Sequence, residues 1–136
     1  MNGVIPVEPK ANPYYSNTFQ YAALTIGAED TNVIKVTVQL QTPARDNVAA
    51  RKGFLCYLSD NANGDDLIGT AHTSIAVAAV GVLIPLVAGK AFLAKTDANG
   101  VIDINITQSS GAKTAYLNIV MPDGSVQTSA AITHAA

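Results

Sequence analysis

The sequence has few of the residues from which most catalytic and metal sites are built. Among its 136 residues are two histidines, one cysteine and no tryptophan. A single cysteine excludes an intrachain disulfide. A Gly-x-Ser-x-Gly nucleophile motif, a glycine-rich phosphate loop and a His-Glu-x-x-His zinc motif are all missing. We therefore expect a protein that is not an enzyme and that needs no cofactor.

Charged residues are also scarce. They make up 13% of the chain, about half of the share that is usual in globular proteins. Eight basic and ten acidic residues leave a net charge of −2, too near neutral to attract nucleic acid or an anionic membrane. A surface with so few charges is poorly protected against association. We therefore expect a homo-oligomer or a crowded assembly, with neither nucleic acid nor membrane as a partner.

One apolar stretch, residues 75–94, could be taken for a membrane span. Pro85 interrupts it, and its uncharged part, residues 75–89, is shorter than the about 20 residues that a bilayer-spanning helix needs. Its β-branched residues instead favour a strand at residues 82–87. The N-terminus lacks the basic and apolar regions of a signal peptide, so we expect the protein to stay in the cytoplasm where it is made.

Residues 1–30 predict an extended N-terminal arm, followed by a domain that covers residues 31–136. Three prolines within the first thirteen residues disfavour a helix. Four of the eight aromatic residues lie close together in this segment, as is typical of surfaces that bind a partner. The side chains expected to contact a neighbouring subunit are Tyr14, Tyr15, Phe19 and Tyr21. A frayed terminus is the alternative, and residues 18–26 also allow a short strand.

Alternation of apolar and polar residues predicts strands at residues 34–41 and 102–107, each with one face in a core and one in water. The Asp97-Ala98-Asn99-Gly100 segment is typical of a tight turn, because Asn and Gly tolerate positive φ angles. We therefore expect residues 91–94 to pair with residues 102–107 as a hairpin.

The remaining apolar runs complete the predicted fold. Residues 54–58 favour a strand that is buried on both faces, with Cys56 as a core residue rather than a nucleophile. Roughly seven or eight short strands with frequent turn signals and no helical period predict an all-β fold. The expected architecture is an antiparallel two-sheet sandwich of the immunoglobulin-like kind, with a jelly roll or a small barrel as the alternative.

The polar loop at residues 59–66 carries oxygen ligands of the type that calcium prefers. Aligned with an EF-hand loop, it fails at the first and last ligand positions. We interpret it as an ordinary polar loop and predict no metal site. An irregular ion site would use the weak candidates Asp60, Asp65 and Asp66. His72 and His134 are too few for a histidine-based site, and we expect them at the surface or near the terminus.

Two sets of residues resemble known families. The turn and strand at residues 96–104, together with residues 36–40, resemble bacterial immunoglobulin-like repeats of the invasin type. Further blocks resemble short virion proteins of tailed bacteriophages, which include capsid decoration or cement proteins. These blocks are residues 57–65, 83–87, 116–117, 121–124 and 129–133.

The bacteriophage resemblance implies a structural role. Decoration proteins sit on the capsid surface and hold neighbouring subunits of the major capsid protein together. The resemblance therefore implies a virion protein that is made in the host cytoplasm, binds the major capsid protein and forms a homo-oligomer on the capsid. The alternative is an immunoglobulin-like adhesion or carbohydrate-binding module of a phage tail, a fibre or a cell surface. Because sugars stack on aromatic rings, the presence of only Tyr57 and Tyr116 as tyrosines in the core domain disfavours sugar binding.

Overall fold

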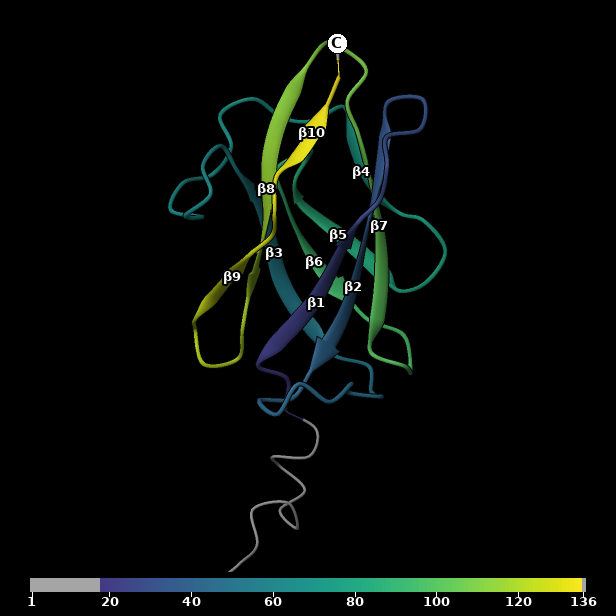
Figure 1. The fold of residues 1–136 in the computed structure, drawn as a ribbon, viewed down its shortest axis with the longest axis vertical. Coiled ribbons are helices and arrows are strands. Elements are labelled where there is room, and N and C mark those ends of the chain that lie inside the picture. The colour runs from purple at the N-terminus through teal and green to yellow at the C-terminus, as the bar shows by residue number, and fades with distance from the viewer. Residues whose placement is uncertain (1–17, 136) are drawn as a thin grey trace, which may run out of the picture.

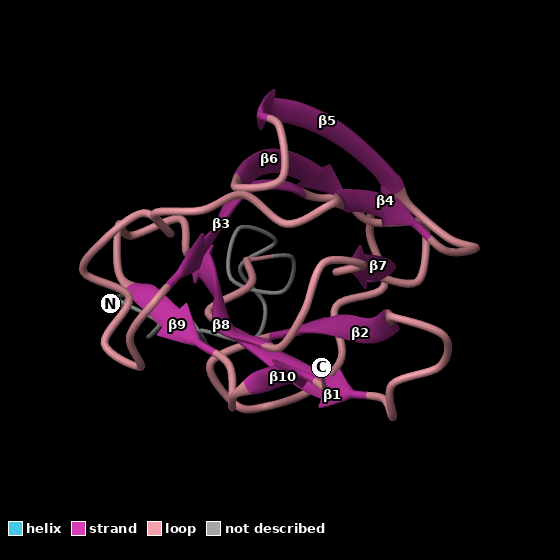
Figure 2. Cartoon of the chain, turned by 90° about the horizontal axis from the view of Figure 1, so that it is seen from above, coloured by secondary structure: helices cyan, strands magenta, loops and turns pink. Residues whose placement is uncertain are grey.

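The computed structural model of the protein describes residues 18–135, which form ten strands in two sheets (Figures 1 and 2). The first sheet consists, in spatial order, of β1 (Tyr21–Ile26), β2 (Val33–Gln41), β7 (Val101–Thr107) and β4 (Ser74–Val77). The second consists, in spatial order, of β10 (Ile132–His134), β8 (Lys113–Val120), β3 (Gly53–Ser59), β6 (Ala91–Lys95) and β5 (Val82–Val87). A further strand, β9 (Val126–Thr128), pairs with β8.

Every ladder in both sheets is antiparallel, and no ladder joins the sheets to each other in the described part of the chain. The predicted antiparallel two-sheet sandwich is therefore confirmed, and the closed-barrel alternative is not observed. Residues 18–135 contain no helix that is long and apolar enough to cross a membrane.

The core lies between the sheets and is built by the predicted alternation. The isoleucines of β7 and the inward valines of β2 have no exposed surface, and they face the inward residues of β3 and β8. Each of these side chains contributes roughly 1.5–3 kcal/mol by leaving water. The fully buried residues of these four strands include Val36, Val38, Cys56, Leu58, Ile102, Ile104, Ile106, Leu117 and Ile119.

The predicted hairpin between residues 91–94 and 102–107 is wrong. β6 pairs with β3 and β5, whereas β7 pairs with β2 and β4, so these consecutive strands belong to different sheets. The segment between them still forms a tight turn, in which Asp97 Oδ1 accepts the N–H of Asn99 at 2.9 Å and that of Val101 at 3.1 Å. The turn therefore carries the chain from one sheet to the other.

The boundary between arm and domain, predicted at residue 30, is also wrong. Residues 21–26 form β1 and pair with β2 at six consecutive positions. Phe19 is 4% exposed, and its ring packs edge-on against Phe54 with 5.7 Å between the ring centroids. Pairing satisfies the backbone groups of this segment while its apolar side chains enter the core. The arm prediction for residues 1–17 lies outside the described residues.

Asp103 departs from the water-facing position that the alternation predicts. Its carboxylate is buried beneath the connection between β4 and β5, where it accepts the N–H groups of Ala79 and Val80, both at 2.8 Å. Burial alone would raise the pKa of Asp103, but the backbone donors outweigh it and lower the pKa below its ordinary value. The ionised carboxylate therefore fixes this connection to β7.

Candidate functional site

The aspartates named as weak ion ligands do not converge. No group of three or more His, Cys, Asp or Glu side chains that could hold a metal ion occurs within residues 18–135. The carboxylates bond to their own loop instead. Asp60 Oδ2 accepts the N–H of Gly69 at 3.0 Å, Asp65 Oδ1 accepts Asn61 Nδ2 at 2.6 Å, and Asp66 Oδ1 accepts the N–H of Asp60 at 3.3 Å. These bonds shape the loop.

The cysteine and the two histidines are buried. Cys56 lies in β3 with its thiol in the core, as predicted, and burial raises the pKa of this thiol. His72 and His134 were expected at the surface or near the terminus, and their exposed fractions are 3% and 0%. A surface position is therefore wrong for both. His134 does lie near the end of the chain, but this end returns to the sandwich as β10 and pairs with β8.

Of the four aromatic residues expected to bind a partner, Phe19 and Tyr21 can be placed. Phe19 is a core residue and offers no surface to a partner, so its predicted role is wrong. Tyr21 begins β1 and remains half-buried, with the Arg45 guanidinium 3.7 Å from its ring centroid. Tyr14 and Tyr15 lie outside the described residues.

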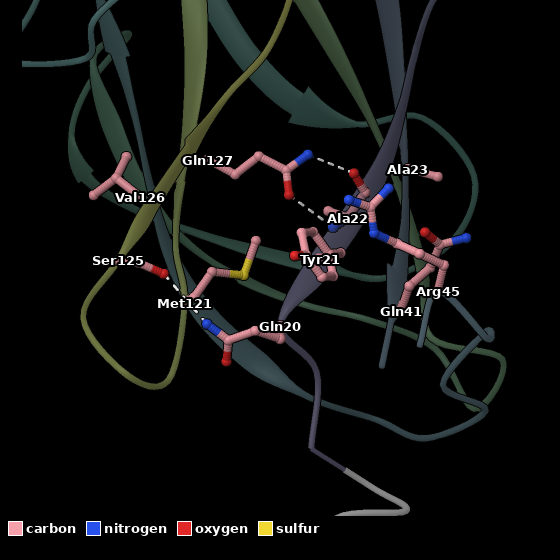
Figure 3. A pocket seen from close by; sticks show the side chains of 10 residues that line it. All are labelled: Gln20, Tyr21, Ala22, Ala23, Gln41, Arg45, Met121, Ser125, Val126 and Gln127. Atoms are coloured by element: carbon pink, nitrogen blue, oxygen red, sulfur yellow. Dashed lines mark hydrogen bonds between the residues drawn. The ribbon is translucent and has the colours of Figure 1, made fainter. Parts of the chain in front are cut away.

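Tyr21 borders a hollow of about 520 Å³ between β1 and the β8–β9 turn (Figure 3). Its walls are mainly neutral amides and aliphatic groups. The Gln127 side chain bridges the hollow: its Nε2 donates to the Ala22 carbonyl at 2.6 Å and its Oε1 accepts the Ala22 N–H at 2.9 Å. One amide satisfies both backbone groups of Ala22 at the edge of β1. We therefore interpret the residues of this hollow as a structural link between β1 and β9 that covers the edge of the first sheet.

A different surface has the properties of a binding site. On the outer face of the second sheet, Ile84 of β5 lies opposite Leu93 of β6, which in turn lies opposite Leu55 of β3. Residues directly opposite one another in a sheet share a face, so the three side chains form one row. Their exposed fractions are 55%, 41% and 37%. We call this row and its exposed neighbours Val82, Leu86 and Val87 the apolar face.

The apolar face overturns the prediction that β3 is buried on both sides. Phe54, Cys56 and Leu58 point into the core, while Leu55 points outward and Tyr57 is half-buried. A shallow hollow of about 310 Å³ lies across the face, and Lys95 is the charged residue at its edge. The strand is thus apolar on both sides, although only one of them is covered by the rest of the described chain.

By contrast, the first sheet has the usual distribution of apolar residues on its inner face and polar residues on its outer face. Along β2 the buried valines alternate with Lys35, Thr37 and Gln39, which are exposed or half-buried. Antiparallel sandwiches normally keep polar residues on their outer faces in this way. Exposed apolar patches that depart from the pattern mark interaction sites. The difference between the two sheets therefore singles out the apolar face.

The edge of the same sheet is protected against further strand pairing. β5 is its outermost strand (Figure 2) and carries Pro85 in its middle, with an irregular register between Pro85 and Val87. Proline lacks the backbone N–H that an added strand would need, and an irregular edge twists away from a regular partner. A partner of this sheet would therefore contact its face rather than extend it.

Sequence reasoning missed the apolar face, although one signal for it was present. Residues 82–87 are apolar without alternation, which is typical either of a buried strand or of an outer strand with an apolar exposed side. The order of strands in the sheet decides between these possibilities.

Comparisons with known proteins give little similarity. No family model matches the sequence, and no match was found among curated proteins. Among solved structures, the chain is similar to a cohesin module from the Clostridium perfringens ATCC13124 family 33 glycoside hydrolase. The two share 12% sequence identity with a TM-score of 0.36, over 86% of this chain and 94% of that module.

Proposed function

We propose that the protein is a structural virion protein, a capsid decoration or cement protein that binds the lattice of the major capsid protein. The observation that carries this proposal is the apolar face, with Ile84, Leu93 and Leu55 exposed in one row. Such a face stabilises a complex by leaving water, and it provides no group for catalysis. The sequence blocks that resemble bacteriophage virion proteins favour the major capsid protein as the partner.

Binding to a repeating shell would strengthen modest contacts. The face is shallow, and Lys95 is the one charged residue among the described residues that line its hollow, so a single contact would be weak and mainly apolar. When copies of the protein form a homo-oligomer on the capsid surface, each further contact is made at high effective concentration. The proposal therefore places the protein on the outside of the virion, where it holds neighbouring capsid subunits together.

The alternative, an adhesion or carbohydrate-binding module of a tail, a fibre or a cell surface, has less support. Sugars are held by exposed aromatic rings, and the large exposed residues of this face are aliphatic. The tyrosines of the same sheet, Tyr57 and Tyr116, are half-buried. An aliphatic surface is better suited to a protein partner.

The double substitution Ile84→Ser and Leu93→Ser is expected to weaken binding to capsid shells by about 10–100-fold, because two apolar contacts are lost at the centre of the face. Binding is measured by co-sedimentation with shells assembled from the major capsid protein without this chain. Circular dichroism and a thermal melt confirm that the variant is folded.

Leu67→Ser is the matched control. Leu67 is 45% exposed and lies in the connection between β3 and β4, outside the apolar face. This substitution removes the same kind of side chain and is expected to leave shell binding unchanged. Equal binding by the wild type and the double variant would refute the role of the apolar face.

A further inference from the structure

Two buried histidines meet near the C-terminal strand. His72 belongs to the connection between β3 and β4, and His134 is the last residue of β10, which lies beside β8 (Figure 1). Their ring centroids are 5.6 Å apart, with 57° between the ring planes. These are the only histidines in the sequence, and both are buried.

Of the two rings, that of His134 has a hydrogen-bond partner and that of His72 has none among the described residues. His134 Nε2 lies 3.0 Å from the Ile106 carbonyl oxygen. Because a carbonyl can only accept, Nε2 carries the proton, and this bond ties β10 to β7 of the opposite sheet. Neither ring nitrogen of His72, nor Nδ1 of His134, has a hydrogen-bond partner among the described residues. Protonation of His72 would therefore place a charge on a buried ring that has no hydrogen-bond partner.

A nearby positive charge makes protonation of His72 still less favourable. Lys113 lies opposite His134 in the β8–β10 ladder, and its ammonium group donates to the carbonyls of Thr70 and Ala71, directly before His72. Burial, then Lys113 and then His134 lower the pKa of His72, and Asp60 opposes them with a smaller effect, leaving the pKa at about 4.

The other charged groups around the pair hold the same two segments. The Lys90 ammonium group donates to the Gly69 carbonyl at 3.0 Å. On the other side, Glu29 Oε1 accepts the N–H of Ala135 at 2.8 Å. Residues 69–72 and the end of β10 are thus fixed mainly by bonds to backbone groups, which can open without unfolding the sheets.

We propose that His72 and His134 form an acid-sensitive latch, in which proton uptake by His72 releases β10 and residues 69–73 from the sandwich before the rest of the domain unfolds. β10 is suited to this role because it has three residues and pairs with β8 on one side. Opening therefore breaks one short ladder, the bond to Ile106 and the bonds of residues 69–72 and Ala135 described above. Ile132 of β10 leaves the core, whereas β2 stays paired with β7 and β3 with β8.

The direction of the pH dependence follows from proton binding. In the open form His72 has its ordinary pKa of 6.5, whereas in the closed form the pKa is about 4. Above pH 6.5 neither form binds the proton, and the latch is independent of pH. Below it, opening becomes up to about tenfold more favourable per pH unit, and by pH 4 it is favoured roughly 100-fold more than at neutral pH.

NMR spectroscopy of the full chain between pH 8 and pH 4 tests the latch. Backbone signals of β10 and of residues 69–73 are expected to move to random-coil positions below about pH 5, while those of β2 and β7 stay native. His72→Leu should preserve the native β10 signals down to pH 4. Asp46→Asn, which removes an exposed carboxylate, is the control and should respond to acid like the wild type.

Two results would overturn the proposal. One is a wild-type β10 that remains native to pH 4, and the other is a His72 imidazole that titrates near pH 6.5 while the domain is folded. Both are read from the wild type, so the test holds even where His72→Leu does not fold. The pKa of Asp103 is lowered from 3.8, so its contribution to stability is lost mainly below pH 4, outside the range of this experiment.

Discussion

Gly100→Ala is expected to lower the free energy of unfolding by about 4 kcal/mol or more, which is among the largest effects of a single substitution. Gly100 has a φ angle of +74°, and a Cβ atom there would lie 1.8 Å from the Val48 carbonyl oxygen. The neighbouring backbone cannot easily move away. Leu40 donates its N–H to the Gly100 carbonyl and accepts that of Val48, both at 2.9 Å. Urea unfolding followed by circular dichroism measures the loss.

Gly124→Ala is the matched control, because it shares the backbone conformation but not the clash. Its φ angle is +90°, and a Cβ atom there would meet nothing within 4 Å. The expected loss is about 1–2 kcal/mol, the cost of a left-handed conformation for an L-residue. Similar losses for the two variants would show that the contact between Gly100 and Val48 is not as close as described.

Ile104→Ala is expected to lower the free energy of unfolding by about 2–5 kcal/mol, the range found when a buried Ile or Leu is cut back to Ala. Ile104 is 0% exposed and lies in β7 between Val36 of β2 and Val77 of β4. Neighbouring strands on both sides restrict the collapse of the cavity that the substitution would leave. Chemical denaturation of the variant and the wild type measures the difference.

Asn105→Ala tests the register of the same strand. Asn105 lies one residue further along β7, on the opposite face, and is partly exposed. The substitution is expected to change the free energy of unfolding by no more than about 0.5 kcal/mol. If both substitutions destabilised the protein equally, the assignment of inward and outward faces in β7 would be incorrect.

The sequence was sufficient to predict the strands that have one polar face. In residues 34–41 and 102–107 the alternation is regular, and a shift by one residue would expose every isoleucine or valine of the strand. This local pattern therefore predicted which residues of these two strands face the core. It also predicted the buried position of Cys56, because a small apolar side chain within an apolar run is typical of a core.

Pairing partners were harder to predict, as the turn at residues 97–100 shows. Its sequence specifies a reversal of the chain, and the reversal is present. The ends of the turn, however, are held by distant segments: Thr96 bonds to the backbone of Ala50 and Lys52, and the Gly100 carbonyl accepts the N–H of Leu40. These bonds direct the two flanking strands into different sheets.

By itself, the sequence determined which residues are extended, where the chain turns and which side chains avoid water, because these properties depend on neighbours within a few residues. Only the tertiary structure decided that β5 is an outer strand, that the side of β3 with Leu55 is uncovered and that His72 lies against His134. Each of these features depends on contacts between residues far apart in the chain. An apolar strand has the same local pattern whether another layer covers it or not.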